Sequence, residues 1–183
     1  MPITVTIPAG AEAYDSEASE FLLVDKDVLI TLEHSLVSIH KWEQHWHVPF
    51  LDKNYNKTHE QILDYLRCMT LSKHVEDYMY YLIPRSEIER VKEYIENPMT
   101  ATTIKDTSSR PDREIKTAEV LYSDMIMLGI PFECRKWHLN TLIMLIRVCA
   151  EKQKPQKYKP RSEVLAENRA LNQARKLALH TRG

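Results

Sequence analysis

The residue types best equipped for chemistry are histidines, four of which fall within residues 32–50, LEHSLVSIHKWEQHWHVPF. Neutral imidazole is a common zinc ligand, so one hypothesis is a metal-dependent enzyme built on this stretch. His34 and His45 are eleven residues apart and nearly share a helical face, whereas His40 points elsewhere and His47 lies at the expected helix end. Because HExxH is absent, as is an HxH pair with a carboxylate motif, we expect no metal ion and no other cofactor.

Cys134 and His138 form a second candidate pair, because residues four apart can share a helical face and could supply a nucleophile or metal ligands. No oxyanion-hole glycine or orienting acid motif accompanies them in the sequence. The carboxylates are interspersed with basic residues, as in ERVKEYIE, which is typical of solvated i,i+4 pairs. We therefore expect a buried thiol beside a structural histidine, in a protein that is not an enzyme.

The elements that position these residues are predicted to be mainly helices. Only three glycines stand against nine prolines in 183 residues, which disfavours phosphate loops and tightly turned β folds. The predicted fold is a mainly α protein, in which a helical domain carries a small N-terminal β-hairpin or sheet and a C-terminal basic helix. ITVTIPA and FLLV are expected to pair as the hairpin across the polar loop AEAYDSEASE, with VLITL at 28–32 as a possible third strand.

Helix start and stop signals place the remaining elements. Trp42 and Trp46 are expected in the core of a helix over about 34–46, which covers the hairpin and leaves the histidines mostly at its wet edge. The other expected features are a second helix begun by a Thr58 and Gln61 capping box, a short helix over 74–82, a helix capped by Ser86, an exposed loop or irregular hairpin over 100–114, and a helix over about 114–128 with Gly129 at C′.

Charge divides the chain unevenly into a helical domain over 1–152, a linker over 153–160 and a basic helix over 161–183. Residues 1–150 have a formal charge of −7 and residues 151–183 a formal charge of +6. The basic helix is either a solvated face or a contact for an acidic partner. Nucleic acid is disfavoured as a partner because the pI is near 6.7 and aromatic residues are not interleaved with the basic ones.

No signal peptide or membrane span is expected, and the odd number of cysteines indicates reduced thiols.

Partner binding is expected on two helices. The segment CRKWHLNTLIMLIRVCAEK is apolar almost all round, which is typical of a helix that is central in the fold or packed in an oligomer. The residues expected to contact a partner are Trp137, Leu142, Leu145 and Ile146 in this segment, together with Arg169, Arg175 and Lys176 in the basic helix. The alternative interpretation is that the apolar residues are simply core.

Five stretches stand together in order: LEHSLVSIHKWEQHWHVPFL, DYLRCMTL, NPMTAT, TAEVLYSDMIMLGIPFECRKWHLNTLIMLIRVC and ENRALNQARK. With them the chain, from about residue 1 to 178, resembles the tail assembly chaperones of long, non-contractile-tailed bacteriophages. The segment around IPFECRKWHLN is the most specific part of this resemblance.

The resemblance implies a non-enzymatic protein of the host cell cytoplasm that binds the tape measure protein and keeps it soluble while tail tube subunits assemble around it. It also implies absence from the mature virion and contact with the tail tube protein through a longer, frameshifted form. We further expect several copies to coat one client through the apolar faces near Trp137 to Ile146. The rival hypothesis is a virion structural protein such as a head-to-tail adaptor, which would also be small, helical and oligomeric.

Overall fold

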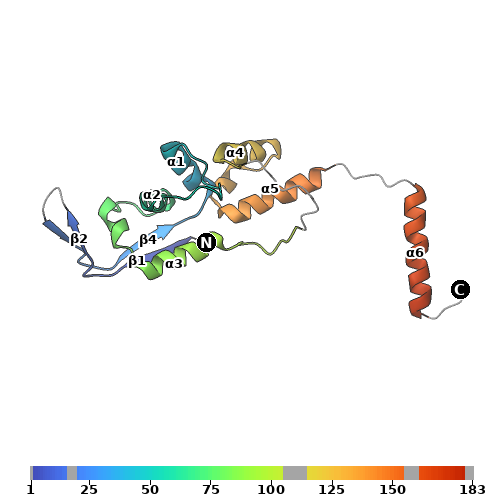
Figure 1. Ribbon diagram of the computed structural model, residues 1–183, viewed down its shortest axis with the longest axis horizontal. Helices are drawn as coiled ribbons and strands as arrows, with labels where there is room; N and C mark the ends of the chain where they lie inside the picture. The colour runs from blue at the N-terminus through green and yellow to red at the C-terminus, as the bar shows by residue number, and fades with distance from the viewer. Residues whose placement is uncertain (1, 16–19, 105–114, 155–160, 180–183) are drawn as a thin grey trace. The chain divides into compact units, whose positions relative to one another are not determined.

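The computed structural model describes residues 2–15, 20–104, 115–154 and 161–179, which fall into two compact units, Met1–Glu151 and Lys152–Gly183. The predicted mainly helical class with a small N-terminal sheet is confirmed (Figure 1). In chain order the elements are β1 (Ile3–Ile7), β2 (Glu12–Asp15), β3 (Glu20–Leu23), β4 (Val28–Leu32), α1 (Leu36–Trp46), α2 (His59–Met69), η1 (Asp77–Leu82), α3 (Arg85–Glu96), α4 (Ala118–Met127), η2 (Phe132–Lys136), α5 (Leu139–Gln153) and α6 (Arg161–Leu179).

The strand pairing differs from the expected hairpin. β1 pairs antiparallel with β4, while β2 and β3 form a separate hairpin between them in the sequence. The pairing of ITVTIPA with FLLV was therefore wrong, and part of the expected polar loop is strand. The reason is side-chain matching: β1 and β4 both present alternating apolar residues that are fully buried on the core side, namely Val5, Ile7, Ile30 and Leu32.

Two capped helices, α1 and α2, pack against each other and hold the tryptophans, and α3 contacts β1. The Thr58 hydroxyl accepts from the Gln61 backbone N–H, and the Gln61 side chain accepts from the Thr58 N–H, so the predicted capping box is confirmed. Trp42 is fully buried, and its Nε1–H donates to the Gln61 carbonyl at 2.9 Å. Trp46 is half-buried, with its Nε1–H 2.8 Å from an Asp64 carboxylate oxygen. The expectation that Trp42 belongs to the core is confirmed.

The chain between β4 and α1 is a hub where three distant segments meet. The Glu33 N–H donates to the Met69 carbonyl at 2.9 Å, which ties the hub to the end of α2. The Leu139 N–H donates to the His34 carbonyl at 2.8 Å, and Ser35 forms an isolated antiparallel bridge with His138, so the start of α5 lies on the other side. Residues more than a hundred positions apart thus share backbone hydrogen bonds here.

The later helices lie where they were predicted but differ at their ends. α3 begins at Arg85 after Pro84, which has N-cap geometry, so Ser86 lies inside the helix and the predicted cap was wrong. α4 begins at Ala118, because the Thr117 hydroxyl accepts from the Val120 N–H. Gly129 has φ +66°, which confirms the predicted C′ glycine. Most of the expected 100–114 loop, residues 105–114, lies outside the described residues.

The segment expected as one apolar helix from Cys134 onward is two elements. Cys134 lies in the 3-10 helix η2, and His138 follows before α5 begins, so the two residues are not one helical turn apart. Along α6 none of residues 161–179 is buried. Among the described helices, none combines the length and the hydropathy needed to cross a bilayer.

Candidate functional site

The residues with chemical potential gather at the hub, where two histidines and two tyrosines are buried together. His34 is 2% exposed and His138 is 6% exposed, and their ring centroids lie 5.2 Å apart. The His34 Nδ1 lies 2.5 Å from the Tyr65 hydroxyl of α2. The Tyr94 hydroxyl of α3 donates to the Glu33 carboxylate. The expectation that the histidines lie mostly at a wet edge was therefore wrong for His34.

The hydrogen bonds of His138 assign its protonation state. Its Nε2 lies 3.1 Å from the Tyr94 carbonyl oxygen, which can only accept, so Nε2 carries the proton. Its Nδ1 accepts from the Asn140 backbone N–H at 3.3 Å, so this nitrogen carries none. His138 is therefore a neutral imidazole with both nitrogens engaged.

Burial lowers the pKa of both imidazole rings. Loss of solvent and, to a smaller extent, the neighbouring His138 together lower the pKa of His34 to about 3. Desolvation also lowers the pKa of His138, opposed by its bond to the Tyr94 carbonyl and by the charge of Glu33. Both imidazoles are therefore held neutral at pH 7, and their nitrogens link α2, α3 and α5 to the hub.

This arrangement is better suited to holding the core together than to reacting. The partners of the two rings are a hydroxyl, a carbonyl and an N–H of the protein itself. Throughout the described ranges, no group of three or more His, Cys, Asp or Glu residues is close enough to hold a metal ion. Cys134 is buried in η2, outside any helical pairing with His138.

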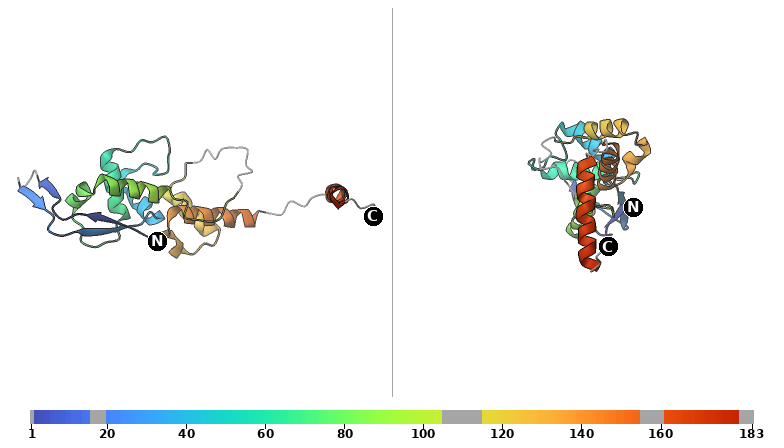
Figure 2. Two further views of the ribbon diagram at one scale, coloured as in Figure 1. Left: turned by 90° about the horizontal axis from the view of Figure 1, so that it is seen from below. Right: turned by 90° about the vertical axis from the view of Figure 1, so that its right-hand side faces the viewer.

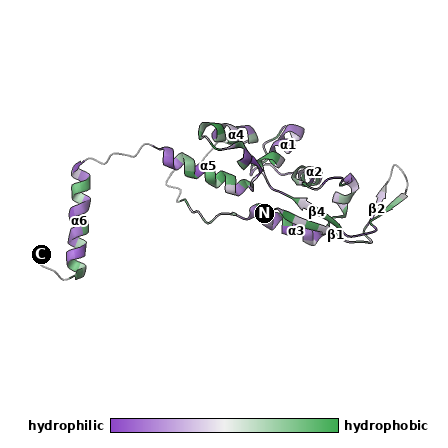
Figure 3. Cartoon of the chain, turned by 180° about the vertical axis from the view of Figure 1, so that it is seen from behind, coloured by the Kyte–Doolittle hydropathy of each residue, from purple (hydrophilic) through white to green (hydrophobic). Residues whose placement is uncertain are grey.

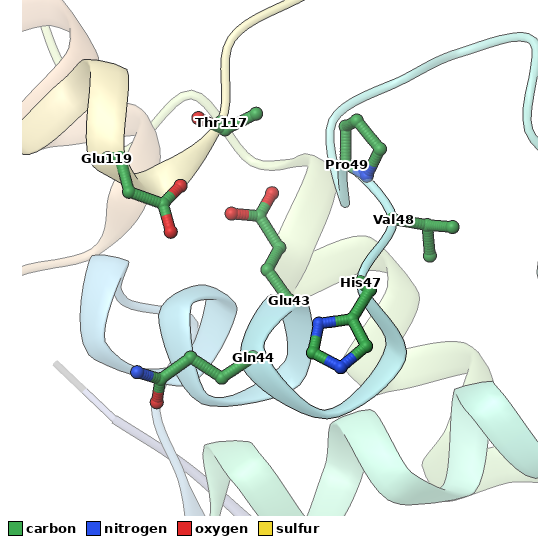
Figure 4. Close-up of a pocket in the computed structure, with 7 residues that line it drawn as sticks. All are labelled: Glu43, Gln44, His47, Val48, Pro49, Thr117 and Glu119. Carbon is green, nitrogen blue, oxygen red and sulfur yellow. The ribbon is translucent and has the colours of Figure 1, made fainter.

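A second candidate site, which contains two carboxylates, is an open hollow of about 560 Å³ between the end of α1 and the start of α4 (Figure 4). Glu43 points into it from α1, and Glu119 lies across it on α4. His47 closes α1 in a left-handed conformation, with φ 54°, and its N–H donates to the Glu43 carbonyl at 2.8 Å. A pair of acids beside a histidine is a possible acid–base site, so the state of Glu43 decides its role.

Both carboxylate oxygens of Glu43 accept backbone hydrogen bonds. One accepts from the Phe50 N–H at 2.8 Å and the other from the Ala118 N–H at 2.7 Å. Desolvation raises the pKa of Glu43, and these two bonds partly offset that effect. The pKa of Glu119 is lowered by its own backbone N–H and by the Thr117 hydroxyl. Glu43 therefore cross-links two segments 75 residues apart, and sequence reasoning missed it because both of its partners are backbone groups.

The residues expected to bind a partner separate into three environments. Leu142 is fully buried and Ile146 is 6% exposed, so both belong to the core and neither can contact a partner on this surface. Leu145 is half-buried, while Trp137 is 47% exposed. The basic residues of the set, Arg169, Arg175 and Lys176, are exposed on α6, in the other unit.

An exposed apolar surface that sequence reasoning missed lies on α4 and η2. The α4 patch consists of Tyr122, Ile126, Met127 and Phe132. Ile126 is 64% exposed and Met127 is 76% exposed, and the Tyr122 ring stacks on Phe132 with centroids 6.1 Å apart. The available signal was the composition of the helix itself, since AEVLYSDMIM is apolar on more than one face. Figure 3 shows hydrophobic residues along both α4 and α5.

A shallow groove beside α5 adds to this apolar surface. It has a volume of about 340 Å³ and lies between α5 and the segment that follows α3. Ile143, Met144 and Pro98 supply its apolar lining, and Glu96 and Arg147 stand among its polar lining. Half-buried side chains of α5 line this groove, so a partner helix could contact them there. Leu142 and Ile146 are buried and are not part of its lining.

Comparison with protein-family models, with curated proteins and with solved structures returns no match for this chain.

Proposed function

We propose that this protein is a phage tail assembly chaperone that binds helical segments of the tape measure protein and keeps them soluble. The observation that carries the proposal is the α4 patch, where large apolar side chains are exposed on a helix with a stacked aromatic pair at its edge. Exposed apolar side chains on one face of a small protein mark a surface for a partner.

The groove along α5 supports the same mode of binding. An amphipathic client helix presents apolar anchors three and four residues apart and inserts them into an apolar groove. Trp137, at 47% exposure between η2 and α5, adds an aromatic anchor of the kind that often dominates interface energy. The two hub histidines and Glu43 are already engaged by hydrogen bonds within the protein itself, which favours a binding role over catalysis.

Co-expression with the tape measure protein tests the proposal. The client should remain in the soluble fraction with the wild-type chain and should precipitate without it. Replacing Ile126 and Met127 by serine should weaken client binding at least about tenfold, because each large apolar side chain contributes about 1.5 to 3 kcal/mol when buried. The binding is measured by pull-down and by titration of the purified components.

Leu71→Ser is the matched control, since Leu71 is 58% exposed and lies outside the α4 patch and the α5 groove. It should retain wild-type binding. Equal solubility of the client with and without the chain would refute the proposal, as would detection of the chain in purified particles, which would favour the head-to-tail adaptor.

A further inference from the structure

The β2–β3 hairpin exposes an apolar face that nothing in the described structure covers. Tyr14 and Phe21 are paired across the strands with ring centroids 5.1 Å apart, and they are 58% and 70% exposed. Leu23, two residues beyond Phe21 and therefore on the same face, is 54% exposed. The opposite face carries Ala13 and Leu22, which are half-buried. A two-stranded hairpin that is apolar on both faces indicates a second contact beyond its own domain.

The surroundings of this hairpin are acidic. Residues 11–27 contain six Asp and Glu and one lysine, a formal charge of −5 in seventeen residues. Glu12 is exposed on the same face as Tyr14, and Asp25 is exposed just past the hairpin. The complementary surface must therefore be apolar and positively charged.

The chain itself contains such a surface on α6. By their spacing, four apolar residues of this helix share one stripe about 120° wide, namely Val164, Leu165, Leu171 and Leu179. Val164 and Leu171 are 40% and 54% exposed, and Leu165, at the edge of the stripe, is 47% exposed. Arg161 and Arg175 lie within this stripe, whereas Glu163 and Glu167 lie outside it, and Figure 3 shows α6 alternating between hydrophobic and hydrophilic residues. The helix is about 28 Å long and a four-residue strand is about 13 Å long, so one hairpin covers roughly half of it.

The geometry of unit 1 favours the α6 of another copy over the chain's own. The hairpin lies at one end of this unit and the carboxyl end of α5 at the other (Figures 1 and 2). A compact unit of this size is about 40 Å across, given a radius of gyration of about 15 Å. Residues 154–160, which precede α6, span at most about 25 Å when fully extended, so Val164 and Leu165 near the start of the chain's own α6 fall short of its own hairpin.

We propose that the apolar, acidic face of the β2–β3 hairpin binds the basic, amphipathic helix α6 of a second copy of this chain. The interface is head-to-tail, because a copy that offers its hairpin to one neighbour offers its α6 to another. Such a heterologous contact joins copies into a ring or an open chain instead of a closed dimer. It requires no client, so it stands or falls separately from the proposed chaperone function.

Light scattering coupled to size-exclusion chromatography tests the proposal on the purified full chain at low ionic strength. The wild type should exceed its monomer mass of 21.5 kDa increasingly with concentration, and added salt should reverse this. One variant, R161Q/R175Q, removes the positive charges on the apolar side of α6, and the other, E12K/D25K, reverses the charge of the acidic hairpin surface. Each variant alone should remain monomeric.

Mixing the two variants gives the decisive result. The tail of the hairpin variant and the hairpin of the tail variant are both intact, so an equimolar mixture should form dimers and nothing larger. The matched control is E96K/E133K, which makes the same change in charge at exposed acids outside the hairpin and should assemble like the wild type. A monomeric wild type at about 100 μM, assembly of either variant alone, or a mixture that stays monomeric would each overturn the proposal. Far-UV circular dichroism checks that all variants are folded.

Discussion

Lowering the pH from 7.5 to 5 should destabilise this protein through His34. The unfolded chain takes up a proton on this histidine as the pH falls below 6.5, whereas the folded chain does so only near pH 3. The unfolded state therefore binds more protons throughout this interval, and stability falls as the pH falls. By linkage the loss at pH 5 is about 2 kcal/mol, and this figure changes little if the folded pKa is one unit higher.

Urea denaturation at a series of pH values measures the effect, and His34→Gln isolates it. Glutamine retains hydrogen-bonding atoms near Tyr65 and cannot titrate, so the variant should lose about 2 kcal/mol less than the wild type between pH 7.5 and 5. This comparison cancels the raised pKa of Glu43, which acts in the opposite direction. His45→Gln, at an exposed position, is the matched control and should follow the wild type. A His34→Gln variant with the wild-type pH dependence would refute the reasoning that His34 is buried neutral.

Two further predictions concern the helices that border the hub and the hollow of Figure 4. Trp42→Ala should lower the free energy of unfolding by about 3 to 5 kcal/mol in urea denaturation, because the side chain is fully buried and its bond to Gln61 is lost. A folded Trp42→Ala protein of wild-type stability would contradict its place in the core. Glu43→Gln should cost about 1 to 3 kcal/mol, since the amide can no longer accept from both Phe50 and Ala118, and an unchanged unfolding midpoint would contradict the cross-link.

Local signals in the sequence predicted the positions of the helices and some of their ends. The Thr58 and Gln61 capping box and the glycine after α4 were predicted because their chemistry involves residues a few positions apart. The error at Ser86 has the same origin: a serine that could cap competes with the proline two residues earlier, and the proline's fixed φ decides where α3 begins.

Long-range pairing was beyond local signals. β1 pairs with β4, although the β2–β3 hairpin lies between them in the sequence. The residues of β1 and β4 alone do not predict this pairing. His34 was misplaced for a similar reason, because helical spacing describes one helix, whereas this residue precedes α1 and is covered by Tyr65 of α2 and His138. Of the candidate site, Trp137 is exposed and its contact with a partner stays a prediction, whereas the α4 patch and Glu43 depend on which faces the tertiary packing leaves open.

The hub at residues 33–35 also sets an order of events during synthesis of the chain. β4 leaves the ribosome about a hundred residues before Leu139, whose N–H completes the hub at the His34 carbonyl. At about 5 to 20 residues per second, the wait lasts about 5 to 20 s. Nascent chains that end before α5 should therefore leave the His34 side of the hub, where His138 and Leu139 pack, open to proteases and to other chains until α5 has been translated.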